Sequence, residues 1–255
     1  MRTVFATLLL LAIGAISTIW GIDVAVGMKA EQEGFFYSSD RKVWAHRGYF
    51  ENAPENSLAA FQAALEHGAP GSEMDIFFDV ALGGYVVSHD HPYHRVDGQL
   101  VMLSDVLNAM PEDFTFWFDF KNLMFLSASE VTQAMQRLHA LDQRYNIAAR
   151  SVVESENAYR GRDVQKAGFH ASYWLNLSAD TSAIRYFATL YKVKLLYLWG
   201  AFNAISMDYV NFDARLEQGL AGIPLLLFTV DDPQLLAQFR ANEGVRIILT
   251  DSGKF

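Results

Sequence analysis

The chain has 255 residues, no cysteine and a formal net charge of −9 at pH 7. Its hydrophobic content of 51% is sufficient for one large core, and α/β barrels of about 200–250 residues commonly form a single domain. The negative charge argues against a nucleic-acid-binding protein, which normally carries a basic face. The lack of cysteine excludes disulfides, thiolate catalysis and thiolate metal sites.

A long apolar run begins the sequence. Between Arg2 and Lys29, Asp23 is the only charged residue. About 20 apolar residues are enough to cross a bilayer as a helix, and no small-residue cleavage site of the A-x-A kind follows. We therefore expect residues 1–28 to form a single-pass membrane anchor, with a cleaved signal segment or a buried helix as alternatives. Arg2 precedes the run, which predicts export of the rest of the chain; after signal cleavage that part would be secreted or periplasmic.

Residues 29–41 are polar and contain Gly and Ser, so a short linker is expected there. The remaining residues, 42–255, form the expected folded domain. Apolar stretches of strand length recur along it, and helical patterns lie between most of them. The expected strands are at 43–45, 74–78, 114–120, 151–154, 171–175, 204–207, 224–230 and 246–250, and the expected helices at 57–68, 129–141, 157–168, 181–192 and 231–244.

Local signals support several of these helices. Gly68 is a stop signal for the first helix of the domain. The second helix is expected to begin at a serine N-cap, Ser129, and to bury Val131, Met135 and Leu138. In the last helix, Asp232 is suited to the N-cap and Pro233 to the first helical position. Eight buried strands alternating with helices predict a closed (β/α)₈ TIM barrel, with a doubly wound open sheet as the alternative. No G-x-G-x-x-G motif supports dinucleotide binding.

Ionisable residues gather where these strands end. In a (β/α)₈ barrel, functional side chains lie at the carboxyl ends of the strands, and residues two apart on a strand share a face. His89 ends an extension of the second unit, residues 85–89. The other ionisable residues in this pattern are His46 and Arg47 after the first strand, Glu73 and Asp75 on the second, and Asp119 and Lys121 on the third.

Three carboxylates in a dry barrel mouth would repel one another unless a cation lay among them. Oxygen ligands favour one hard divalent ion, calcium or magnesium. Two histidines beside such an ion could act as general acid and base. Arg47 and Lys121 could hold the charge of a phosphoryl group. Asp119 could instead be a simple ion-pair partner of Lys121, with Glu154 as the next candidate ligand.

The ordered motifs "HRG" (46–48), "PENS" (54–57), Glu73-x-Asp75 and "VVSHD" (86–90) resemble the glycerophosphodiester phosphodiesterase family, among the barrel phosphodiesterases of the phosphatidylinositol phospholipase C-like superfamily. The resemblance extends from about residue 43 to residue 251. It implies a phosphoric diester hydrolase acting on a small phosphodiester or lipid headgroup, and no nucleic-acid partner. The implied roles are an acid/base pair at His46 and His89, metal ligands at Glu73 and Asp75, phosphate binding at Arg47 and an ordering role at Glu55.

The sequence departs from the family pattern at several positions. The family usually has a Glu two residues before the Lys, where this chain has Asp119 and Lys121, as in the related sphingomyelinase D enzymes. Ser57 stands for the usual Thr, and Phe228 for a common Trp. Two alternatives to glycerophosphodiester hydrolysis therefore remain open: hydrolysis of an intact phospholipid, and a non-catalytic membrane-anchored binding domain. His91 and His94 are expected in a solvated loop, and the aromatic residues Tyr173, Trp174, Tyr197 and Trp199 mainly in packing.

Overall fold

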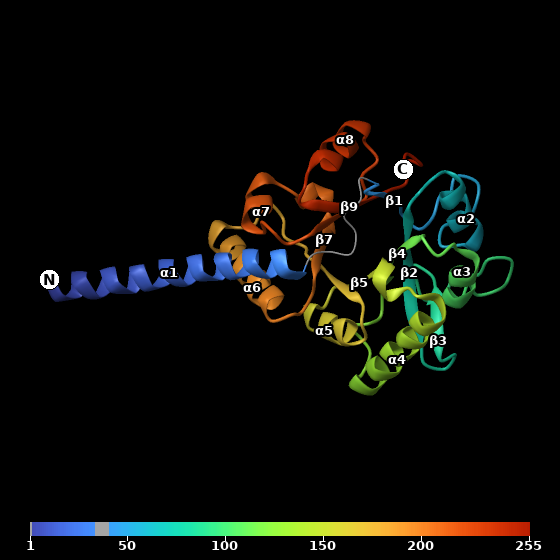
Figure 1. Ribbon diagram of the computed structural model, residues 1–255, viewed down its shortest axis with the longest axis horizontal. Helices are drawn as coiled ribbons and strands as arrows, with labels where there is room; N and C mark the ends of the chain where they lie inside the picture. Colours follow the sequence, from blue (N-terminus) through green and yellow to red (C-terminus); the bar gives the residue numbers. More distant parts are fainter. Residues whose placement is uncertain (1, 34–40) are drawn as a thin grey trace.

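The protein is described by a computed structural model covering residues 2–33 and 41–255. In this part of the chain, eight parallel strands close into a barrel that helices surround, and one long helix projects from it (Figure 1). Because β1 pairs with both β2 and β9, the sheet is closed and the open doubly wound alternative is wrong. The parallel strands are β1 (Val43–Ala45), β2 (Gly71–Asp79), β4 (Thr115–Phe120), β5 (Ser151–Ser155), β6 (His170–Trp174), β7 (Ala204–Asp208), β8 (Leu225–Phe228) and β9 (Val245–Thr250).

The short strand β3 (Gly84–Val87) pairs antiparallel with β2 outside the parallel barrel. It corresponds to the extension expected in the second unit. Helices of the (β/α)₈ pattern follow the parallel strands: α2 (Leu58–Glu66), α3 (Leu103–Ala109), α4 (Ala128–Tyr145), α5 (Ala158–Lys166), α6 (Ala183–Leu198), α7 (Ala214–Gly219) and α8 (Pro233–Ala241). Two short 3₁₀ turns, Ala148–Arg150 and Tyr209–Asn211, complete the connections. The sequence patterns predicted neither α3 nor α7, both of which are at most two turns long.

Local chemistry explains where the predicted helices begin and end. Asp232 accepts hydrogen bonds from the first turn of α8 and Pro233 is its first residue, as expected. Gly68 has a φ of +86°, which ends α2. For α4 the predicted cap is wrong. Ser127, not Ser129, caps the helix, because the side chains of Ser127 and Glu130 satisfy each other's backbone N–H groups in a capping box.

The barrel interior is filled by side chains that alternate along the strands. Near the amino ends of the strands these residues are apolar, and towards the carboxyl ends polar residues take their place. On β2 and β4, for example, Glu73 lies beside Trp117, and Asp75 lies beside Asp119 at the next inward position. The apolar interior layer consists of Trp44, Trp117, Val152, Ala204, Leu226, Ile247 and Leu249. The ionisable groups therefore lie above a packed apolar plug.

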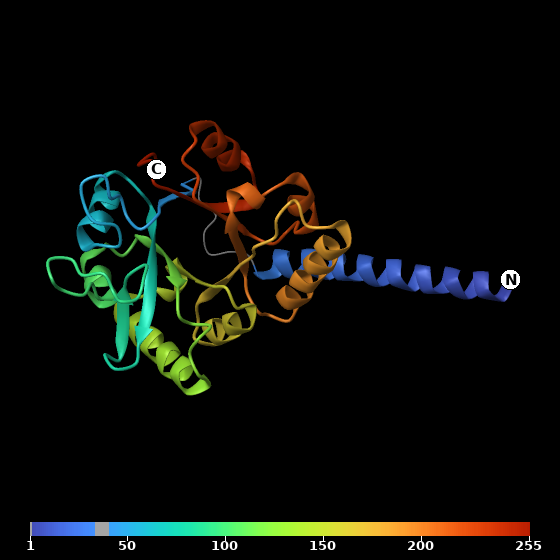
Figure 2. The ribbon, with the colours of Figure 1, turned by 180° about the vertical axis from the view of Figure 1, so that it is seen from behind.

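The helix α1 (Arg2–Glu33) includes the predicted apolar anchor and continues past it. It covers residues 29–33, the start of the segment expected as a linker, while residues 34–40 lie outside the described part of the chain. Figures 1 and 2 show that its carboxyl-terminal part lies beside α6, whereas its amino-terminal part stands free of the barrel. The stretch from Val4 to Glu33 is long and apolar enough to cross a membrane, and the mean hydropathy of its 18-residue apolar part is 2.1.

Candidate functional site

The turn after β1 presents His46 and Arg47 to the mouth of the barrel. Arg47 has a φ of +55° and Gly48 a φ of +84°. A Cβ on Gly48 would lie 2.7 Å from the Ala60 carbonyl carbon, so only glycine fits this close approach to α2. The Asn56 N–H donates to the Arg47 carbonyl oxygen over 3.0 Å. The two sequence motifs at 46–48 and 54–57 are thus one folded unit.

Ser57 caps α2 by accepting a hydrogen bond from the Ala60 N–H. A hydroxyl is sufficient for this contact, so the departure from the family's usual Thr preserves the helix start. Asn56, which the sequence analysis did not single out, reaches into the mouth. Its side chain donates to Asp75 Oδ2 over 2.7 Å and accepts from the Asp75 N–H over 3.1 Å. Its place inside the Pro-Glu-Asn motif was the available signal.

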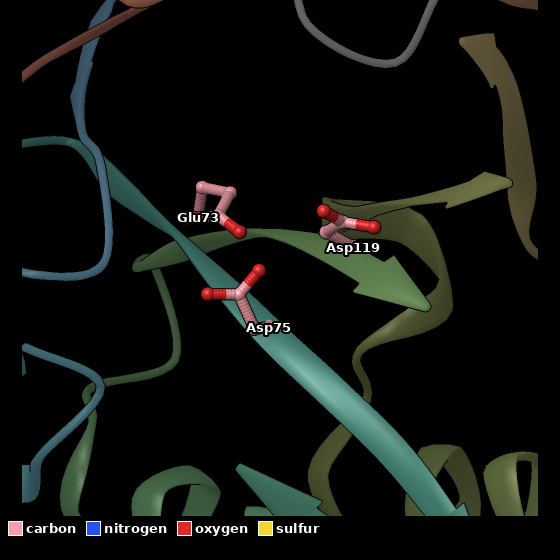
Figure 3. Close-up of side chains that lie close together, drawn as sticks. All are labelled: Glu73, Asp75 and Asp119. Atoms are coloured by element: carbon pink, nitrogen blue, oxygen red, sulfur yellow. The ribbon is translucent and has the colours of Figure 1, made fainter. Parts of the chain in front are cut away.

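Three carboxylates converge at the centre of the mouth. Glu73 and Asp75 point inward from β2 and Asp119 from the adjacent β4 (Figure 3). One oxygen from each lies within 4.8 Å of the other two. Glu73 is 3% exposed and Asp75 is 1% exposed. Such a group of buried oxygen donors is the kind of set that holds a hard divalent cation, so the residues present fit the expected ion.

Two cationic side chains border the carboxylates. Lys121 Nζ lies 2.6 Å from Asp119 Oδ2 and 2.8 Å from Asp75 Oδ1. Arg47 Nε lies 3.2 Å from Asp75 Oδ2, and the Arg47 N–H donates to Glu73 over 3.0 Å. Glu55 holds the Arg47 guanidinium from the other side, with both carboxylate oxygens 3.2 Å from Nη1. Glu55 thus contacts the Arg47 guanidinium on the side away from Asp75.

Burial and neighbouring charges shift the pKa values of several side chains at the mouth. Burial, reinforced by Asp75, raises the pKa of Glu73 well above its usual value. Burial also raises the pKa of Asp119 to about 6, although Lys121 opposes the shift. For Lys121, burial lowers the pKa, but Asp119 and Asp75 together outweigh it and the net shift is upward. The lysine stays charged, whereas Glu73 and Asp119 would be fully ionised near neutral pH only with additional positive charge nearby.

The two histidines occupy different settings. His46 Nδ1 lies 2.9 Å from Asp251 Oδ1, directly after β9, and 3.4 Å from Thr229 Oγ1. His89 is 37% exposed and its Nδ1 lies 3.1 Å from Asp90 Oδ1. The sequence analysis assigned no role to Asp251 or Thr229. Both follow carboxyl ends of barrel strands, so the rule that selected the other residues would have found them.

One cavity of about 240 Å³ joins these groups. Trp174 and Phe228 form part of its wall. Trp174 was expected mainly in packing, and it also lies at the mouth of the barrel. Among the described residues that line the cavity, His91 is absent. The cavity is lined by His46, Arg47, Glu73, Asp75, His89, Trp117, Asp119, Lys121, Glu154, Trp174, Phe228, Thr229 and Leu249.

Glu154 is a fourth carboxylate at this cavity. It pairs in register with Asp119 on the neighbouring strand and is 3% exposed. Its Oε2 has no hydrogen-bond partner among the described residues. Burial, followed by the charge of Asp119, raises its pKa well above the usual value. An oxygen without a hydrogen bond on a buried carboxyl costs free energy in an apolar barrel. Beside Asp119, Glu154 is therefore expected either to bind a ligand or to carry a proton.

Comparison with known proteins agrees with this geometry. Residues 46–106 match the model of the glycerophosphoryl diester phosphodiesterase family. A curated glycerophosphodiester phosphodiesterase from Caldanaerobacter subterraneus subsp. tengcongensis is 26% identical over 242 residues, covering 82% of this chain and 93% of that protein. The chain is similar to the glycerophosphoryl diester phosphodiesterase family in the segment that carries most of the site. These matches indicate a phosphoric diester hydrolase.

Solved structures share the fold. The glycerophosphodiester phosphodiesterase of Thermotoga maritima superposes with a TM-score of 0.61 at 20% identity, covering 83% of this chain and 95% of that one. A phosphodiesterase of Oleispira antarctica, solved in complex with the product sn-glycerol-3-phosphate, gives a TM-score of 0.60 at 16% identity, covering 83% and 93%. The predicted (β/α)₈ barrel is thereby confirmed for this chain.

Proposed function

We propose that this chain hydrolyses a glycerophosphodiester to glycerol phosphate and the alcohol of the headgroup. The observation that carries the proposal is that two imidazoles, two cations and four carboxylates border one cavity of about 240 Å³. That volume is small beside the about 300–1,000 Å³ of sites for drug-sized ligands, and it suits a phosphodiester of glycerol. The product complex of the Oleispira antarctica enzyme supports the same substrate class.

One divalent cation, calcium or magnesium, is the proposed cofactor. Glu73, Asp75 and Asp119 would hold it, since their oxygens already lie within 4.8 Å of one another. When bound, the ion supplies positive charge that stabilises the phosphoryl oxygens and keeps the surrounding carboxylates ionised. Glu154, beside Asp119 in register, is the candidate for an additional ligand.

Arg47 and Lys121 bind the non-bridging phosphate oxygens in this proposal. Glu55 holds Nη1 of the Arg47 guanidinium and Asp75 faces Nε, which leaves Nη2 for the substrate. The guanidinium gives a directional, charge-assisted hydrogen bond to phosphate, and the lysine acts as a compact point charge. Both cations are pre-positioned by carboxylates, so little side-chain freedom is lost when the phosphate binds.

Proton transfer falls to His46 and His89. One imidazole takes the proton of the attacking oxygen. Attack by water gives glycerol phosphate directly, whereas attack by a neighbouring hydroxyl of the glycerol gives a cyclic phosphate that water then opens in a second step of the same kind. A bond forms between that oxygen and phosphorus, and the bond from phosphorus to the leaving alcohol oxygen breaks. The other imidazole donates its proton to the leaving oxygen. Asp251 orients His46 through Nδ1, which directs Nε2 to the cavity.

We also propose that α1 remains attached and anchors the enzyme in a membrane, with the barrel on the exported side. The support is the apolar segment from Val4 onwards, whose most hydrophobic window is not buried against the barrel. Arg2 precedes that segment, in agreement with the positive-inside rule. Alkaline carbonate extraction followed by N-terminal sequencing tests this part. A soluble product that begins near Lys29 would contradict it.

The reaction is tested by incubating the full chain with soluble glycerophosphodiesters and with intact phospholipids in vesicles. Each incubation is run with a chelator, with calcium and with magnesium. We expect glycerol phosphate from the soluble diesters only when a cation is present. Release of phosphorylated products only from intact phospholipids would favour the phospholipase alternative. No turnover with any substrate would favour a binding domain, and so would a rate that His46→Ala leaves unchanged.

A further inference from the structure

The carboxyl-terminal part of α1 is docked on the barrel. Asp23 Oδ1 lies 2.5 Å from Lys194 Nζ on α6, and the Tyr191 hydroxyl donates to Asp23 Oδ2 over 2.9 Å. Three residues further along α1, Val26 is only 1% exposed. A Cβ on Gly222 would approach the Ala30 Cβ to 3.3 Å, so the turn before β8 packs closely against α1 as well. These contacts fix α1 to the barrel.

The contacts end abruptly towards the amino terminus. Phe5, Leu10, Ile16 and Trp20 are 70%, 70%, 66% and 69% exposed. Residues 2–21 form about 30 Å of helix at 1.5 Å per residue, which matches the hydrocarbon thickness of a bilayer. Asp23, just beyond this stretch, has its charge compensated by Lys194 on the barrel. The membrane boundary on α1 therefore falls just before Asp23, with Trp20 at the level of the headgroups.

The direction of α6 determines which part of the barrel reaches that boundary. Asp23 meets Tyr191 and Lys194, whereas Lys29 lies over the ring of Tyr197, so α1 and α6 run the same way. Consequently the amino-terminal end of α6 points towards the free part of α1. Both ribbon views show this end of α6 as the part of the barrel that extends furthest along α1 (Figures 1 and 2).

That end of α6 carries apolar side chains with no packing role in the barrel. Ile184 is 86% exposed and Phe187 is 49% exposed. Being three residues apart, they lie on one face of the helix, and the Phe187 ring packs on Tyr191 at 4.6 Å. Arg185, between them, is also exposed. Exposed apolar residues flanked by a cation are typical of a helix that lies at a lipid interface.

The same end of α6 belongs to the mouth of the barrel. α6 follows β6, and after α6 the chain returns to the start of β6, where the Asn203 N–H donates to the Ala171 carbonyl oxygen over 2.8 Å. The carboxyl end of α6 is thus at the amino ends of the strands, and its amino end is beside their carboxyl ends. The Arg215 guanidinium, after β7, donates to the Ala179 carbonyl oxygen before α6 and links the two mouth loops.

We infer that Ile184 and Phe187, at the amino-terminal end of α6, rest in the bilayer that α1 spans, so that the β6–β7 side of the barrel mouth borders the membrane surface. The occupant of this apolar face is the lipid of that bilayer, because α1 emerges directly beside it and its length places the boundary there. The inference rests on the proposed anchoring. It also narrows the substrate class to phosphodiesters that arise at, or remain in, a lipid surface.

The absence of native cysteine allows the contact to be measured on the full chain. Ile184→Cys, Phe187→Cys and the control Leu65→Cys each accept one bimane label. Leu65 is exposed in the last turn of α2, on the side of the barrel away from α1 (Figure 1). In phosphatidylcholine vesicles with brominated acyl chains, we expect loss of fluorescence at positions 184 and 187 and none at 65.

Unquenched labels at both α6 positions, in a chain that floats with the vesicles, would overturn the inference and leave the anchor intact. A chain that does not float overturns the anchor as well. Hydrolysis of a soluble diester by the same samples reports separately on the proposed reaction. As a functional readout, the double variant Ile184→Asp, Phe187→Asp should lose rate on vesicle-borne diesters and keep the wild-type rate on soluble ones. Leu65→Asp should change neither; equal rates for the double variant on both substrates would count against the contact.

Discussion

Asp251 Oδ1 lies 2.9 Å from His46 Nδ1, which joins the last strand of the barrel to the turn after the first. Asp251 is itself held in place, because its N–H donates to Asp231 Oδ1 over 2.8 Å. A carboxylate at this position fixes the orientation and tautomer of the imidazole.

We therefore expect Asp251→Ala to lower kcat with little change in KM. The loss should be smaller than the about 10²- to 10⁴-fold expected for His46→Ala, because the imidazole itself remains. Asp251→Asn should retain part of the rate through its amide oxygen. Steady-state kinetics on a soluble diester measures these effects, with the exposed Asp180→Ala as a charge-matched control. A wild-type rate in Asp251→Ala would remove its positioning role.

The two histidines should behave as a unit. His46→Ala and His89→Ala should each reduce kcat by about 10²- to 10⁴-fold, the usual contribution of one general acid or base. The loss of kcat in the double variant should be far smaller than the product of the two single losses, because neither imidazole is useful without the other. Independent, multiplicative losses in the kinetics would contradict a shared turnover and assign the residues to separate steps.

Substitutions of Asp119 and Glu154 test which carboxylates bind the cation. Asp119→Ala should weaken calcium or magnesium binding, and excess cation should partly restore the rate. Asp119→Glu, which introduces the residue common in the family, should be tolerated. Glu154→Gln tests the additional ligand: it should weaken cation binding measured by calorimetry if the carboxylate coordinates. Unchanged affinity in Asp119→Ala would make Asp119 a simple partner of Lys121.

Protonation of the carboxylates should make cation binding depend on pH. The pKa of Asp119 is raised to about 6 in the metal-free protein, so protons compete with the cation below that pH. In calorimetric titrations, the apparent affinity for the cation should fall as the pH is lowered through about 6. A flat affinity between about pH 5 and pH 8 would argue against ligands with raised pKa values.

The raised pKa of Asp119 affects the stability of the metal-free fold in the opposite direction: stability should fall as the pH rises. The folded-state pKa of about 6 exceeds the usual 3.8, so the Asp119 contribution is favourable below 3.8 and is lost as the pH rises through about 6. Asp119→Asn, which stays neutral, should therefore melt close to the wild type at low pH and above it at neutral pH. Thermal unfolding of both chains in chelator checks the sign.

The docking of α1 should contribute to stability. Lys194 is only 8% exposed, so Asp23→Ala leaves a buried ammonium without its carboxylate. We expect a loss of about 1–3 kcal/mol in the free energy of unfolding, as for hydrogen bonds to charged groups. Lys194→Met in the Asp23→Ala background should recover part of it, since the uncompensated charge is gone. Denaturant unfolding in detergent measures both; an unchanged midpoint in Asp23→Ala would show that α1 is not docked through this pair.

The sequence was sufficient for the barrel because its strands are buried runs with clear turn signals between them. α3 and α7 were missed because helices of at most two turns carry too little periodicity to detect. Positions at strand ends, and the period of two along β2 and β4, predicted a common site, and one cavity is lined by His46, Arg47, Glu73, Asp75, His89, Asp119 and Lys121. Asp251 and Thr229 follow the ends of β9 and β8, and their place beside His46 depends on closure of the barrel, which brings these strands next to β1. The cap at Ser127 was misassigned because two serines precede the same glutamate.

The docked half of α1 also affects how the enzyme meets its substrate. A flexible tether would let the barrel sample a volume set by the tether length, and the effective substrate concentration would fall as that volume grows. Here α1 is itself packed against the barrel, held by Asp23, Val26 and Ala30. In the proposed membrane-anchored state the search for substrate is therefore two-dimensional, and turnover of lipid-borne diesters should scale with their mole fraction in the surface rather than with their bulk concentration.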